Sequence, residues 1–110
     1  MLAHEVADLL DARRRGGERY WEFLRVPSMS CGVYELHRGS ADPQSPHTED
    51  EVYYVLRGRA RIRVGSEDRN VRAGSVVFVP ARADHRFHDI VEDLAVLVFF
   101  APAEGTSPGR

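Results

Sequence analysis

The chain contains no lysine and a single cysteine, Cys31, among its 110 residues. One cysteine cannot form an internal disulfide, and an intracellular location is therefore the default expectation. The 15 basic residues are all arginine and are nearly balanced by 17 acidic residues, which leaves a formal net charge of -2. A charge so close to zero gives no general argument for binding to nucleic acid or to an anionic membrane surface.

Long apolar runs are also missing. None approaches the roughly 20 residues that cross a bilayer, and His4, Glu5 and Asp8 interrupt the apolar residues at the start of the chain. Such polar and charged residues do not fit the apolar region of a signal peptide. We therefore expect a cytoplasmic protein with no membrane partner and no nucleic-acid partner.

Several catalytic signatures are absent as well: a phosphate-binding glycine loop, a Cys-x-x-Cys pair, and a serine nucleophile with an arranged base. The length of the chain and its 43% hydrophobic content fit one small domain. A domain of this size buries well under three quarters of its unfolded surface, so a partner subunit would help its stability.

The first 18 residues predict one short amphipathic helix. Apolar side chains recur there at helical spacing, arginines follow near the expected C-terminus, and the pair Gly16 and Gly17 ends the pattern. The apolar positions are Leu2, Val6, Leu9 and Leu10. Because the polar face mixes acidic and basic groups, we expect this helix to pack on a sheet or a partner rather than on a membrane.

From residue 19 onward the pattern is one of strands and turns. Short runs rich in Val, Tyr, Phe and Ile are separated by Gly, Pro and the acidic pair Glu92 and Asp93, which predicts an all-β sandwich or barrel over residues 19–101. The small, polar residues 102–110 predict a flexible tail. The expected strands are Tyr20–Val26, Gly32–Leu36, Val52–Leu56, Ala60–Val64, Ser75–Val79, Arg86–Ile90 and Leu94–Phe100.

Two imidazoles and one carboxylate stand out within this pattern: His47, His85 and Glu51. Side chains two or four residues apart on a strand share a face, so His47 and Glu51 can point the same way, joined by Glu49 and Tyr53. Two histidines and one carboxylate, if they converge, make a metal site with coordination positions left open for a small molecule.

The same residues carry a resemblance to a known family. Gly39, five residues, Ser45, one residue, His47, three residues, Glu51, six residues and Gly58 resemble the first motif of the cupins. The second motif is resembled by Gly74, five residues, Pro80, then Arg82 and, after two further residues, His85. Two ordered motifs with matching internal spacing are a much stronger signal than either motif alone.

The resemblance implies a cupin-like double-stranded jelly-roll β-barrel that holds one divalent metal ion, such as Fe, Zn, Mn or Ni. It implies His47, Glu51 and His85 as the metal ligands. Ser45 stands where the family has a further histidine, and serine is a poor ligand for a transition metal. We therefore expect an open position there, a water molecule, or Glu49.

Two classes of function follow from the resemblance. As an enzyme, the protein would be a non-haem Fe(II) dioxygenase acting on a small organic molecule, with Glu49 or Tyr53 tuning the bound substrate or water. With Zn²⁺ or Mn²⁺ it would instead be an isomerase or lyase. As a binding module, it would hold a small ligand without turnover, because fold alone does not decide between these classes.

Many small cupins form homodimers through sheet faces or exchanged N-terminal strands, and we expect the same here. Val52, Tyr54 and Leu56 place apolar side chains on the outward parity of their strand. Association would cover these side chains and enlarge the core.

Overall fold

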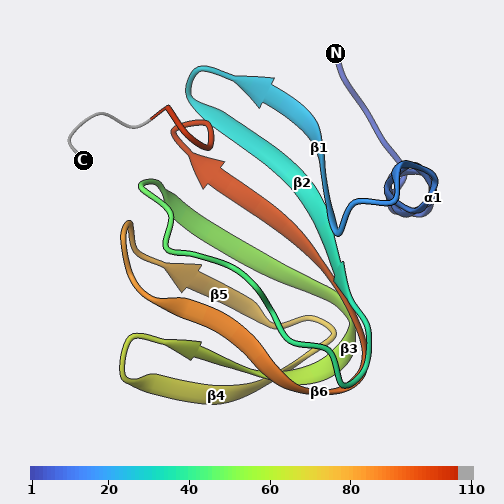
Figure 1. The fold of residues 1–110 in the computed structure, drawn as a ribbon. Helices are drawn as coiled ribbons and strands as arrows, with labels where there is room; N and C mark the ends of the chain where they lie inside the picture. The colour runs from blue at the N-terminus through green and yellow to red at the C-terminus, as the bar shows by residue number, and fades with distance from the viewer. Residues whose placement is uncertain (107–110) are drawn as a thin grey trace.

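Two long strands, β3 (Asp50–Val64) and β6 (His85–Ala101), form the centre of the fold in this computed structural model, which describes residues 1–106. Around them lie helix α1 (Val6–Gly16) and strands β1 (Tyr20–Val26), β2 (Met29–Leu36), β4 (Glu67–Arg72) and β5 (Val76–Val79). Over the described residues the strand order is β1-β2-β6-β3-β4, with β5 pairing with β3, and every pairing is antiparallel. The sheet curls strongly, and the helix lies outside it (Figure 1).

Each long strand serves two parts of the sheet. The first part of β3 pairs with β5 and with the end of β6, whereas its second part pairs with β4 and with the start of β6. Between the two parts, the β3–β6 register shifts repeatedly from Val55 to Arg61. Such irregularities bend a strand and increase its local twist. The bend folds the ladder over on itself and encloses the interior.

Gly58 makes this bend possible. Its φ is 94°, in the left-handed region, and a Cβ at this position would lie 2.3 Å from the carbonyl oxygen of Asp93. Only glycine combines that conformation with so close an approach of two backbones.

The strand predictions were correct in type but wrong in extent. Two predicted strands are joined in β3, and β6 runs straight through Glu92 and Asp93, where a turn was expected. The reason is that a β-bulge interrupts the alternation of apolar and polar residues in the sequence but does not end the strand. Strand β4 was missed because its sequence is almost entirely polar, and of its residues only Val71 is buried. A charged edge strand of this kind discourages pairing with other chains.

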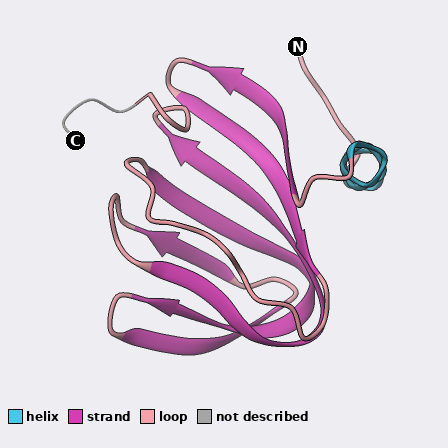
Figure 2. Ribbon diagram, viewed as in Figure 1, coloured by secondary structure: helices cyan, strands magenta, loops and turns pink. Residues whose placement is uncertain are grey.

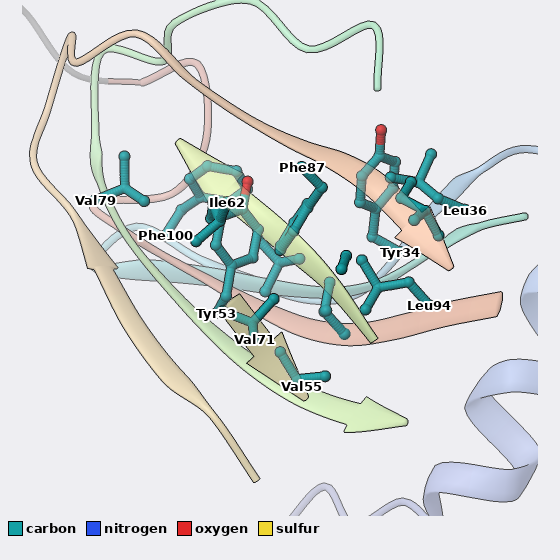
Figure 3. Packing of buried hydrophobic residues seen from close by; sticks show 14 residues of the cluster. Tyr34, Leu36, Tyr53, Val55, Ile62, Val71, Val79, Phe87, Leu94 and Phe100 are labelled. Atoms are coloured by element: carbon teal, nitrogen blue, oxygen red, sulfur yellow. The ribbon is translucent and has the colours of Figure 1, made fainter. Parts of the chain in front are cut away.

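The main core fills the inside of the curled sheet. Tyr53, Ile62 and Phe87 meet there with Phe100, as the sticks in Figure 3 show. The inward and outward alternation predicted for β3 is confirmed, since Tyr53 is buried while Tyr54 is exposed.

Helix α1 covers part of the outer face of the sheet (Figure 2). Leu9 and Leu10 pack against Val33 and Ala95, with Leu56 at the border of the same cluster. The prediction that the helix packs on a sheet is thus confirmed. Its position also means that Leu56, expected to face a second subunit, is partly covered by the chain's own helix.

A cluster of charged side chains holds the helix in place. The carboxylate of Glu35 on β2 accepts hydrogen bonds from Arg13 at 2.7 Å, Arg14 at 3.2 Å and Arg57 at 2.6 Å. Arginines in the last turn also suit the negative end of the helix dipole.

Residues 102–106, the first part of the predicted flexible tail, contact the rest of the fold. Ala103 is buried, the amide of Glu104 donates to Ser30 Oγ at 2.9 Å, and the amide of Ala103 donates to the Pro27 carbonyl at 3.4 Å. These bonds tie the segment to the β1–β2 hairpin, a contact that composition could not reveal. The remainder of the predicted tail, residues 107–110, lies outside the described residues.

Within residues 1–106, no helix has the length and apolar character needed to span a membrane.

Candidate metal centre

His47, Glu51 and His85 come together inside the curled sheet. One potential ligand atom from each lies within 4.8 Å of the other two. Glu51 is supplied by the start of β3, His85 by the start of β6, and His47 by the loop that leads into β3. His85 Nε2 lies 3.2 Å from Glu51 Oε1, and both side chains are almost fully buried.

The Glu51 carboxylate is the most unusual group of this cluster. The residue is 1% exposed, yet neither of its oxygens accepts a hydrogen bond from any residue of the described chain. A buried carboxylate without hydrogen bonds costs several kcal/mol of free energy unless a cation compensates it. A divalent metal ion would provide that compensation.

The two histidines present the same ring nitrogen to the centre. His85 Nδ1 lies 2.9 Å from the Ala83 carbonyl, to which a protonated Nδ1 donates, so that Nε2 is left to face Glu51. His47 Nδ1 lies 3.4 Å from Glu104 Oε2, and its Nε2 faces inward. Outer partners of this kind fix the ring orientation of metal-binding histidines. Burial alone would lower the pKa of His85, but the Glu51 carboxylate and the Ala83 carbonyl outweigh it and raise that pKa.

Gln44, which the sequence reasoning missed, also reaches the centre. Its Oε1 lies 3.3 Å from His47 Nε2 and 3.3 Å from His85 Nε2, and it accepts a hydrogen bond from the Tyr53 hydroxyl at 2.8 Å. Its Nε2 donates to Asp42 Oδ2 at 2.7 Å. Gln44 is the only glutamine of the chain, but it lies in a loop where strand periodicity carries no information.

The two residues predicted as catalytic groups are both buried, and the Tyr53 ring lies 6.1 Å from the His85 ring. Tyr53 is fully buried, and burial and then the Glu51 charge hold its pKa well above the usual value, so the phenol stays a hydrogen-bond donor. Glu49 is buried too and accepts a hydrogen bond from the Thr48 hydroxyl. Ser45, at the position of the missing histidine, is exposed.

A cavity of about 130 Å³ opens beside the cluster. Two of the metal-ligand candidates, His47 and Glu51, contribute to its wall, and neither Glu49 nor Tyr53 is among the described residues that line it. The lining residues are Tyr20, Tyr34, Gln44, His47, Glu51, Val98, Phe100 and Glu104. Since a water molecule takes about 30 Å³ of liquid, the space suits a small molecule or one end of a larger one.

Tyr20 and Glu104 add polar groups to the cavity wall from outside the predicted site. The Tyr20 hydroxyl is buried and has no hydrogen-bond partner among residues 1–106, and burial, followed by the charge of Glu104, raises its pKa. Glu104 belongs to the segment that was expected to be frayed. Burial raises the pKa of Glu104, although nearby His47 opposes this.

Residues 32–100 match the family described as Cupin domain. The chain belongs to the cupin family. Over 98 residues it is 52% identical to the uncharacterized protein SCO3923 of Streptomyces coelicolor, and the match covers 88% of this chain and 93% of that protein.

Solved structures agree with the architecture. The protein TT1209 from Thermus thermophilus is 27% identical, and the match covers 94% of this chain and 99% of that one with a TM-score of 0.75. An RmlC-like cupin with a double-stranded β-helix fold from Methanocaldococcus jannaschii is 18% identical, covering 76% and 78% of the two chains with a TM-score of 0.68. The predicted all-β jelly roll with one short helix is thereby confirmed.

Proposed function

We propose that this cupin binds one divalent metal ion through His47, Glu51 and His85 and acts on, or binds, a small organic molecule in the adjacent cavity. The observation that carries the proposal is the buried Glu51 carboxylate, whose oxygens lack hydrogen bonds although His85 Nε2 lies 3.2 Å away. A metal ion would compensate the charge of this carboxylate, whereas without one the carboxylate faces only the His85 ring and accepts no hydrogen bond.

The side chains around the cavity would make different kinds of contact with a bound small molecule. The unpartnered Tyr20 hydroxyl is available to donate a hydrogen bond to an acceptor atom of the small molecule. Val98 and Phe100 supply apolar walls, which exclude water from the side facing the core. Glu104 closes the cavity next to His47 and orients that ring.

Among the reaction classes, we favour an Fe(II)-dependent dioxygenase. Two histidines and one carboxylate with open positions are the ligand set of non-haem Fe(II) oxygenases, and iron would supply redox chemistry toward O₂ when bound. Tyr53 would act as a positioning residue through its hydrogen bond to Gln44, and Glu49 stays a candidate acid or base in the second layer. With a non-redox ion, the same side chains would serve an isomerase or lyase, or a binding protein without turnover.

Elemental analysis of the bound metal and a nitric oxide binding experiment distinguish these three functions. Protein purified without chelator or added metal should contain close to one equivalent of a divalent transition metal by elemental analysis. Anaerobic loading with Fe(II) and addition of nitric oxide should then give the high-spin iron-nitrosyl signal in electron paramagnetic resonance. Iron-loaded protein without that signal would leave the non-redox and binding functions, and no stoichiometric metal under any loading would contradict the metal site itself.

We also propose that two chains associate through the outer face of the sheet next to β5. Phe78 is 58% exposed and Val76 is 67% exposed, and they pair with Val52 and Tyr54 of β3, so the four side chains form one apolar surface. Apolar surfaces of this kind mark association sites in soluble proteins.

Light scattering of the purified chain tests this association. The mass should be about twice the monomer mass of 12.4 kDa. Phe78→Glu should shift it toward the monomer, while Val91→Glu should not, because Val91 is equally exposed at 58% but lies on β6, which does not pair with β5 in the described chain. A monomeric wild-type protein at tens of micromolar with a normal melting transition would contradict the proposal.

A further inference from the structure

We propose that the amide oxygen of Gln44 is a fourth protein ligand of the metal and takes over the role of the histidine that Ser45 replaces. This inference rests on the proposed metal site and adds a ligand to it. Neither the spacing of the motifs nor the family resemblance points to residue 44, which directly precedes the degenerate motif position.

Distances around Gln44 Oε1 fit a shared metal ion. It lies 3.3 Å from both His47 Nε2 and His85 Nε2, and His85 Nε2 lies 3.2 Å from Glu51 Oε1. Metal–ligand bonds of about 2.1 Å place neighbouring ligand atoms about 3.0 Å apart in an octahedron and about 3.4 Å apart in a tetrahedron. Each of the three observed separations falls within that range.

The amide is held with its oxygen toward the centre. Gln44 Nε2 donates to Asp42 Oδ2 at 2.7 Å, which fixes which end of the amide faces the histidines. The Tyr53 hydroxyl donates to Oε1 at 2.8 Å. A carbonyl-type oxygen has two lone pairs, so this bond leaves one for a metal ion.

Asp42 is itself held by the core. Its Oδ1 accepts a hydrogen bond from the Tyr34 hydroxyl at 2.6 Å, and its Oδ2 accepts one from the backbone amide of Phe87 at 2.9 Å. The carboxylate is buried, and it thereby connects the ligand loop to β2 and β6. Such support around a ligand is what a preorganised metal site requires.

Ser45 is exposed and therefore does not occupy the position of the fourth ligand. With Gln44 as fourth ligand, the set would be two imidazole nitrogens and two oxygens. Replacing an imidazole by an oxygen ligand favours harder ions, so the site would lean toward Fe(II) or Mn²⁺ more than a site with three histidines.

Cobalt(II) titration of the whole protein tests the assignment, with affinity and the visible absorption spectrum as readouts. Gln44→Met keeps the length of the side chain and removes the amide oxygen, and Ser45→Ala is the matched control on the same loop. We expect Gln44→Met to weaken cobalt binding at least about tenfold and to change the intensity of the ligand-field bands, which depends on coordination number. Ser45→Ala should change neither.

Two results would overturn the inference in different ways. If His47→Ala abolishes cobalt binding while Gln44→Met retains both affinity and spectrum, Gln44 is not a ligand and the proposed three-residue site stands. If wild-type protein binds no cobalt, the proposed metal site and the fourth ligand both fail. Circular dichroism melting verifies that each variant is folded, and Gln44→Ala provides a second variant should the methionine disturb packing.

Discussion

His85 Nε2 lies 3.2 Å from Glu51 Oε1, although the two residues stand at opposite ends of the β3–β6 ladder. Glu51 pairs with Phe100 at one end, and His85 pairs with Val64 at the other. The ladder must therefore double back to bring its ends into contact. The candidate metal centre thus depends on the bend in β3 as well as on the three residues that form the cluster.

Gly58→Ala should damage both the fold and the site, because Gly58 occupies that bend. A left-handed conformation alone costs a non-glycine residue roughly 1–3 kcal/mol, and here a Cβ would also lie 2.3 Å from the Asp93 carbonyl oxygen. Gly74 is the control, since its φ of 93° matches the 94° of Gly58 while a Cβ there would meet nothing within 4 Å.

Urea denaturation should then show Gly58→Ala to be less stable than Gly74→Ala by more than about 1 kcal/mol, and only Gly58→Ala should also weaken cobalt binding. Equal losses for the two variants would show that the backbone contact at Gly58 does not set the bend.

Sequence periodicity located the inward-facing residues of the centre well. Glu51 and Tyr53 lie on the buried face of β3 as their parity predicted, and His85 and Phe87 do so on β6. The reason is that a regular strand alternates faces, so one buried position determines its neighbours.

Loop residues could not be predicted in the same way. Gln44, Asp42 and Glu104 reach the centre from segments without a repeating geometry, and their places depend on hydrogen bonds to residues distant in sequence, such as that from Phe87 to Asp42. The small, polar neighbours of Glu104 predicted a flexible tail, so composition gave no reason to expect Glu104 at the centre. The ligand set read from the motifs was therefore too small to describe the whole polar environment.

Replacing Glu51 by glutamine should separate metal binding from folding. The neutral glutamine amide cannot compensate the positive charge of a metal ion as the carboxylate does, so Glu51→Gln should lose most metal affinity. The metal-free variant should nevertheless stay within about 1 kcal/mol of metal-free wild type, because removal of a buried charge without hydrogen bonds offsets the lost attraction between Glu51 and His85. Calorimetric melting with and without chelator measures both effects; a variant destabilised by more than about 1 kcal/mol in chelator would assign the carboxylate a structural role.

The two tyrosines of the cavity wall should respond differently to loss of their hydroxyl groups. Tyr34→Phe should cost about 1–3 kcal/mol, because its hydroxyl donates to buried Asp42 at 2.6 Å and that carboxylate would lose its shortest hydrogen bond. Tyr20→Phe should be neutral within about 0.5 kcal/mol, because its hydroxyl has no partner in the described chain.

Chemical denaturation of the matched pair measures this difference in free energy of unfolding. A large loss for Tyr20→Phe would mean that its hydroxyl serves the fold, and the role in ligand binding proposed above would have to be abandoned.

The Glu35 cluster should make the attachment of helix α1 depend on pH. Burial alone would raise the pKa of Glu35, but hydrogen bonds from Arg14 and Arg13 outweigh it and lower that pKa. A carboxyl group with a lowered pKa in the folded state stabilises the protein above its unfolded pKa of about 4.3, and that contribution is lost as the pH falls through the folded value.

Glu35→Gln should therefore cost about 1–3 kcal/mol at pH 7 and progressively less below about pH 4, measured as the difference in unfolding free energy from wild type. Glu22→Gln is the matched control, since Glu22 pairs with Arg25 at the surface and its loss should cost less than about 1 kcal/mol at either pH. A Glu35 penalty that stays constant from pH 7 to pH 3 would show that the arginines recognise the shape of the side chain and not its charge, because only an ionised carboxylate loses its advantage on protonation.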